Sequence, residues 1–128
     1  MFFDFRRAKK SFLYAFWGLK TVWKEEQNFR FHSLTGLLVV LFAVLLGVNK
    51  QDFIIILVII GLVLILELIN TIFERLIDIL KPRIHDYSKT IKNVSSAVVL
   101  LASFLSLFIG ILIFYPYVKS VLFDFFIK

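Results

Sequence analysis

The feature that most restricts the fold is an apolar stretch that begins at Phe53 and keeps a helical pattern to about Leu80. A membrane-spanning helix needs about 20 such residues, so this stretch is long enough with some to spare. Two shorter apolar stretches cover about 31–48 and about 94–115, where Pro116 marks the expected end of the last one. The chain is also 60% hydrophobic, which is too apolar for an ordinary water-soluble domain. We therefore predict an all-α integral membrane protein whose three transmembrane helices lie at about 31–48, 53–80 and 94–115.

The segment at about 4–24 is periodic instead of uniformly apolar. Phe12, Phe16 and Trp23 recur at helical spacing, whereas most Lys and Arg residues lie elsewhere around the helix. This pattern predicts an N-terminal amphipathic helix on the membrane surface. A soluble helix packed on its own protein would look similar, but a small membrane protein offers little else to pack on. We expect residues 1–128 to form a single membrane-embedded domain.

Lys and Arg are concentrated before the first span and in the polar segment between the second and third, at about 81–92. The positive-inside rule then places the N-terminus in the cytoplasm and the C-terminus outside a multi-pass cell membrane protein. The net charge of +6 suggests contact with anionic lipid or a phosphorylated substrate before nucleic acid, and we expect no nucleic-acid partner. The absence of Cys excludes disulfides, thiolate catalysis and Cys-ligated metals.

The end of the second span carries polar residues where apolar ones would be expected. Glu67, Asn70, Glu74 and Asp78 fall within an arc of about 80° on a helix. We call these four residues the polar stripe. Such a stripe must face protein or water and not lipid. An active site, an ion pathway and polar contacts between helices are all compatible with this spacing.

The members of the polar stripe differ in depth. Glu67 lies deeper in the membrane than Arg75 by roughly 12 Å at the usual helical rise, and is the candidate for accepting a proton. Glu74 and Asp78 lie nearer the interface, and paired carboxylates there suit Mg²⁺, which leaves its other positions to phosphate and water. A deep acid and shallow acids fit a reaction that joins a membrane-borne hydroxyl to a soluble phosphate.

Two flanking segments add polar residues at the same expected side. Glu26 precedes the first span and is a further candidate metal ligand, whereas His32 is expected to be a headgroup or hydrogen-bonding residue and not a metal ligand. Lys92 and Asn93 precede the third span. Lys92 is either a counter-charge for phosphate or a flanking Lys that extends to the interface. No Gly-rich phosphate loop is present, but phosphoryl transfer needs mainly positioning and charge neutralisation.

These motifs together resemble the small prokaryotic diacylglycerol kinase family. The resemblance is carried by "ELINTIFERLID", preceded by "EQNFRFH" and followed by "SKTIKN", and it extends from "FLYAFWGL" to "GILIFYP". It implies a homotrimer with active sites at subunit boundaries, and transfer of the ATP γ-phosphate to a lipid alcohol. The "NFRFH" form resembles the Gram-positive-type branch, which implies undecaprenol as the acceptor. Diacylglycerol is the alternative acceptor, because both lipids are primary alcohols and the spacing does not separate them.

The resemblance also implies a role for each matching position. Glu67 resembles the catalytic base, and Glu74 and Glu26 resemble the pair that binds Mg²⁺. The implied nucleotide contacts are Arg7, Lys10, Asn70, Asp78, Lys92 and Asn93. Asn93 departs from the family, which has Asp there, but the other acidic positions are intact and we expect an active enzyme. The rival hypothesis is a non-enzymatic membrane protein, either an ion pathway or an inactive kinase relative.

Overall fold

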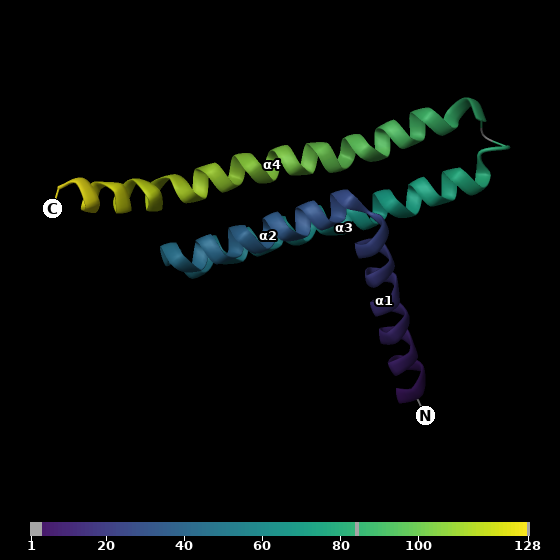
Figure 1. Ribbon diagram of the computed structural model, residues 1–128, viewed down its shortest axis with the longest axis horizontal. Helices are drawn as coiled ribbons and strands as arrows, with labels where there is room; N and C mark the ends of the chain where they lie inside the picture. The colour runs from purple at the N-terminus through teal and green to yellow at the C-terminus, as the bar shows by residue number, and fades with distance from the viewer. Residues whose placement is uncertain (1–3, 84, 128) are drawn as a thin grey trace.

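The computed structural model describes residues 4–83 and 85–127, and its regular structure over these residues is entirely α-helical. The helices in chain order are α1 (Phe5–Glu25), α2 (Gln27–Leu46), α3 (Lys50–Leu80) and α4 (His85–Phe126). Helices α2, α3 and α4 pack together in alternating direction, while α1 leaves the bundle at a steep angle (Figure 1). The predicted all-α class is thus confirmed.

Helices α2, α3 and α4 are each long and apolar enough to cross a membrane. Large apolar side chains cover their outer faces, and Leu45 and Leu101 expose 84% and 72% of their surface. A face of this kind belongs in lipid or against another apolar surface. With 31 residues, α3 measures about 46 Å and is therefore longer than the roughly 30 Å hydrocarbon core. The prediction of three spanning helices is confirmed.

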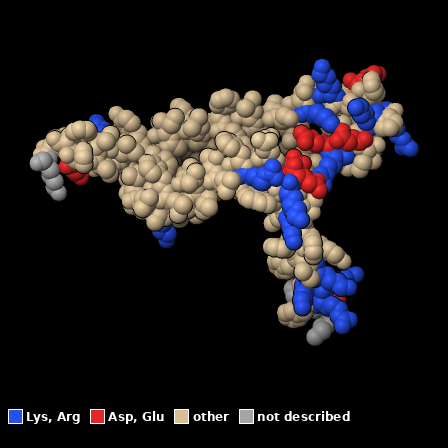
Figure 2. All heavy atoms as spheres, viewed as in Figure 1, with Lys and Arg blue, Asp and Glu red and all other residues tan. Residues whose placement is uncertain are grey.

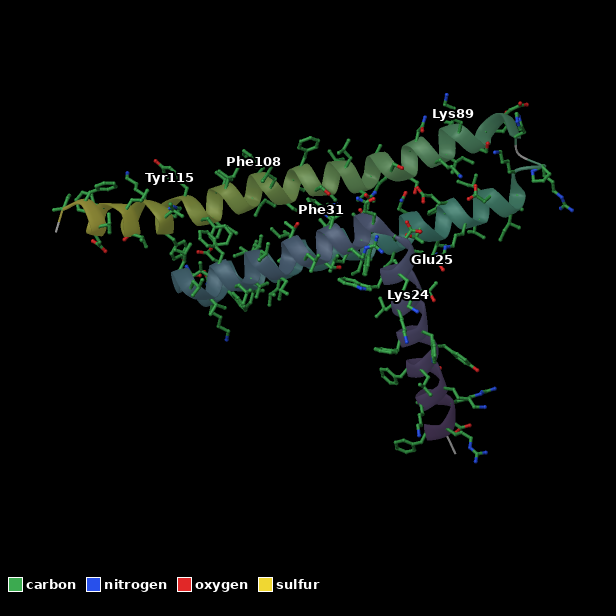
Figure 3. The ribbon with its side chains drawn as sticks, viewed as in Figure 1. Lys24, Glu25, Phe31, Lys89, Phe108 and Tyr115 are labelled. Carbon is green, nitrogen blue, oxygen red and sulfur yellow. The ribbon has the colours of Figure 1, made fainter. Side chains whose placement is uncertain are left out.

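A single residue in extended conformation separates α1 from α2. Glu26 has φ −104° and ψ 109°, which interrupts the helix. Arg30, one turn into α2, donates from Nη1 to the carbonyl oxygens of Trp23 at 3.1 Å and Lys24 at 2.8 Å. These carbonyls at the end of α1 have no partner within their own helix. The Arg30 contacts therefore hold the corner at which Lys24 and Glu25 lie beside the bundle (Figure 3).

A tight turn joins α2 to α3. Gly47 ends α2 with φ 62°, a left-handed conformation that favours glycine. Asn49 then caps α3, and its side chain accepts a hydrogen bond from the Asp52 backbone N–H at 2.8 Å. Further along, a Cβ on Gly36 would lie 2.7 Å from Ile60 Cγ2. The lack of a side chain at Gly36 therefore allows α2 and α3 to approach closely.

Helix α4 is longer at both ends than the predicted third span. It begins at His85, so part of the expected polar loop is helical; Ile84 in that loop lies outside the described residues. Asp86 in the first turn favours this early start because its charge complements the helix dipole. At the other end, the helix continues through Pro116 to Phe126. Pro116, predicted as the end of the third span, therefore lies inside a continuous helix, and the next residue, Tyr117, contacts the α2–α3 turn through its hydroxyl.

Candidate active site

The polar stripe on α3 turns towards the neighbouring helices and becomes less buried along its length. Glu67 and Asn70 are 3% and 8% exposed, Glu74 is half-buried and Asp78 is exposed. The partners of the stripe from outside α3 come from α2 and α4. The arrangement matches the expectation that a polar face on an apolar helix avoids lipid.

The deepest acid meets a histidine from the first turns of α2. Glu67 Oε1 lies 3.2 Å from His32 Nε2, and the two side chains are 4% and 23% exposed. The carboxylate is therefore enclosed, while the imidazole reaches the surface of the chain. Thr71, one turn further along α3, donates its hydroxyl to the Glu67 backbone oxygen at 3.0 Å. A buried charge of this kind is costly without a polar partner, and His32 supplies one.

Asn70 links the stripe to α4. Its Nδ2 donates to Glu74 Oε1 at 3.3 Å, and its Oδ1 accepts from the Ser95 hydroxyl at 2.7 Å. Both ends of the amide are thus engaged, which fixes its orientation. The hydrogen bond from Ser95 to Asn70 is an addition from the structure.

One ion pair includes a member of the stripe, and a second involves the neighbouring Arg75. Lys92 on α4 pairs with Asp78 Oδ1. Arg75 on α3 pairs with Glu25 at 2.5 Å and lies 3.9 Å from Glu26. Blue and red atoms accordingly gather where α1 meets the bundle and towards the neighbouring end of α3 and α4 (Figure 2). The sequence analysis did not predict that Arg75 pairs with Glu25. The available signal was the position of this basic residue, directly after Glu74 and near the expected membrane interface.

The two predicted metal ligands come from different elements, Glu26 from the corner before α2 and Glu74 from α3. Among residues 4–83 and 85–127, no three or more His, Asp or Glu side chains are grouped as a metal site. Mg²⁺ commonly takes one or two carboxylates and completes its shell with phosphate and water. The carboxylates of Glu26 and Glu74 are therefore of the ligand type that this ion takes.

Among the described residues, three predicted nucleotide contacts form no hydrogen bond or ion pair with the polar stripe of their own chain: Arg7, Lys10 and Asn93. Arg7 and Lys10 are exposed near the start of α1, where a basic cluster stands clear of the bundle (Figure 2). Arg7 lies roughly 27 Å along that helix from Glu25. Asn93 is exposed on α4 directly after Lys92. The residues that the structure does bring together are Glu67, Asn70, Glu74, Asp78 and Lys92, together with His32.

The comparison with known proteins places this bundle in a family of membrane enzymes. Residues 13–114 match the sequence model of the family described as Prokaryotic diacylglycerol kinase, and the chain belongs to that family. It is 31% identical over 113 residues to an undecaprenol kinase of Bacillus subtilis, covering 88% of this chain and 92% of the relative.

Two further relatives bear the name diacylglycerol kinase. The protein of Synechocystis sp. is 33% identical over 101 residues, covering 78% of this chain and 58% of that protein. The protein of Escherichia coli K12 is 32% identical over 98 residues, covering 77% and 80%. These matches confirm the predicted resemblance, including its undecaprenol kinase branch, and the enzyme class of lipid kinase.

Proposed function

We propose that this chain transfers the γ-phosphate of ATP to the hydroxyl of undecaprenol at the cytoplasmic side of the cell membrane. The observation that carries the proposal is the buried Glu67 carboxylate on a stripe that ends at the exposed Asp78–Lys92 pair. One helix face thus connects an apolar interior with water. A lipid alcohol approaches from the first of these regions and a nucleotide from the second.

In the proposed reaction, Glu67 acts as general base. The alcohol oxygen forms a bond to the γ-phosphorus while the bond between that phosphorus and the bridging oxygen of ADP breaks. The hydroxyl proton passes to the Glu67 carboxylate, and the products are the lipid phosphate and ADP. Phosphoryl transfer depends chiefly on positioning and on neutralising charge, so a single buried base with nearby cations is sufficient.

The outer part of the stripe holds the nucleotide. Lys92 carries the positive charge that faces the phosphates, and Asp78 and Asn70 provide polar contacts beside it. Glu26 and Glu74 would hold Mg²⁺, which when bound supplies positive charge against the phosphate oxygens. Asn70 donates to Glu74 and thereby orients that carboxylate. Asn93 remains a predicted nucleotide contact next to Lys92.

We further propose that the working unit is a homotrimer with its N-terminus in the cytoplasm and its C-terminus outside. Arg7 and Lys10 lie in the first turns of α1, and this end of α1 stands away from α3 of the same chain (Figure 1). If the site lies at a subunit boundary, Arg7 and Lys10 on α1 of one subunit can contact the nucleotide that is bound at the stripe of another subunit. The concentration of Lys and Arg around the stripe supports a cytoplasmic location for this end.

The similarity to the undecaprenol kinase of Bacillus subtilis favours undecaprenol as the acceptor. Diacylglycerol is the second candidate, since two further relatives are named diacylglycerol kinases. Purified full-length protein, supplied with radiolabelled ATP and each lipid in turn, tests both. We expect label on undecaprenol. If only diacylglycerol is labelled, the assignment of undecaprenol as the acceptor is wrong. If neither lipid is labelled and the protein does not bind ATP, a non-enzymatic role is favoured.

A further inference from the structure

The Glu67 carboxylate is held from outside its own helix. In the described part of the chain, the side chain that approaches its oxygens is His32, whose Nε2 lies 3.2 Å from Oε1. Thr71 contacts the backbone oxygen of Glu67 and not the carboxylate, and Asn70 is engaged with Glu74 and Ser95. The orientation of the buried acid therefore depends on a residue from α2.

The contact leaves the two carboxylate oxygens in different situations. Oε1 faces the imidazole, which leaves Oε2 as the oxygen able to take a proton. A glutamate has three side-chain torsions, so an unheld carboxylate would sample several positions. A base must come within hydrogen-bonding reach of the hydroxyl that it deprotonates. Misplacement by about 1 Å can reduce a rate roughly a hundredfold.

We propose that His32 is a positioning residue, which holds Glu67 by Oε1 so that Oε2 meets the hydroxyl of the acceptor lipid. This inference rests on the proposed function, because it assigns a partner to the base of that reaction. His32 stands in the first turns of α2, close to where Gly36 lets α2 approach α3. The close approach of these helices brings the imidazole within reach of Glu67.

The test compares three substitutions in the full-length protein, assayed with radiolabelled ATP and the lipid that the wild-type protein phosphorylates. His32→Leu keeps the bulk without a donor, His32→Gln keeps an N–H at similar reach, and His32→Asn keeps an amide that is one methylene shorter. We expect His32→Leu and His32→Asn to lower kcat by roughly tenfold to a hundredfold. His32→Gln should keep most of kcat, and KM for ATP should change less than about twofold in all three.

His85→Leu is the matched control, since His85 is exposed at the start of α4 and should leave kcat unchanged. A wild-type kcat in His32→Leu overturns the inference. An equal loss in His32→Gln and His32→Asn also overturns it, because a role in packing alone does not require the longer amide. If His32→Leu does not fold, the comparison of kcat between His32→Gln and His32→Asn still tests the inference. A wild-type protein inactive on both lipids contradicts the proposed function instead.

Discussion

Carboxylates lie at both ends of the helical bundle, but their surroundings differ. At the turn between α2 and α3, Asp52 accepts hydrogen bonds from the Tyr117 hydroxyl at 2.6 Å and from Asn49 Nδ2 at 3.0 Å. The Tyr117 hydroxyl in turn accepts from the Asn49 backbone N–H at 3.1 Å. Neutral donors from two segments thus satisfy one acid in a closed network, which we call the turn network.

The acids of the polar stripe are arranged in the opposite way. Each meets a different partner, and these partners come from α2, α3 and α4: His32 for Glu67, Asn70 for Glu74 and Lys92 for Asp78. The stripe therefore spreads negative charge over several depths, with a cation at its outer end. Residue type alone does not separate the two ends. Contacts at both ends join helices, but only the stripe combines several acids with a cation, as the proposed ligand site requires.

The largest expected effect separates the two ends directly. Glu67→Gln keeps the size of the side chain but removes the base, and we expect kcat to fall by roughly 10²–10⁴-fold. ATP binding should be nearly unchanged because Glu67 lies deeper than the nucleotide contacts. Asp52→Asn makes the same chemical change in the turn network, where we expect lower thermal stability and nearly normal kcat. Equal rates for wild type and Glu67→Gln would show that another group is the base.

A smaller effect is expected from the acids nearer to water. Glu74→Gln should raise KM for MgATP by roughly tenfold or more, which corresponds to about 1.4 kcal/mol of binding. Activity measured over a range of Mg²⁺ concentrations checks this, since a lost metal ligand shifts the requirement to higher Mg²⁺. Glu25→Gln is the control, because Glu25 pairs with Arg75 and is no proposed ligand. If both variants behave alike, general loss of negative charge explains the effect.

Lys92→Met should raise KM for ATP several-fold and leave the thermal stability almost unchanged. The pair with Asp78 is partly exposed, and such surface pairs contribute only about 0–1 kcal/mol to stability. The main loss therefore concerns the nucleotide, and the variant should also show a weaker dependence of KM on salt. Lys89→Met tests the neighbouring cation on α4. A larger effect at Lys89 would move the phosphate contact to that residue.

Much of this arrangement follows from the sequence because helical periodicity determines which residues share a face. The four members of the polar stripe were predicted to lie together from their spacing alone, and the depth order of Glu67, Glu74 and Asp78 follows from the rise per residue. Burial along α3 agrees with that order. These properties are local, because the geometry of a single helix determines them.

The partners of the stripe depend on how separate helices approach each other, which periodicity does not determine. The contact of His32 with Glu67 requires the close packing of α2 on α3, and the Arg75–Glu25 pair requires the corner at Glu26. The contacts of Tyr117 with the turn network, just beyond Pro116, likewise join residues that are distant in the sequence.

The smallest expected effect concerns the position at which this chain departs from the family pattern. Asn93→Asp restores a carboxylate beside Lys92 at an exposed site, where water and salt screen the added charge. We expect kcat to rise or to stay within about threefold of wild type. Asn28→Asp, at an exposed position on α2, adds the same charge as a control. A large loss confined to Asn93→Asp would mean that the nucleotide site of this chain has adapted to the amide. A negative charge at position 93 would then not be required for activity, in contrast to the carboxylates proposed to act in the stripe.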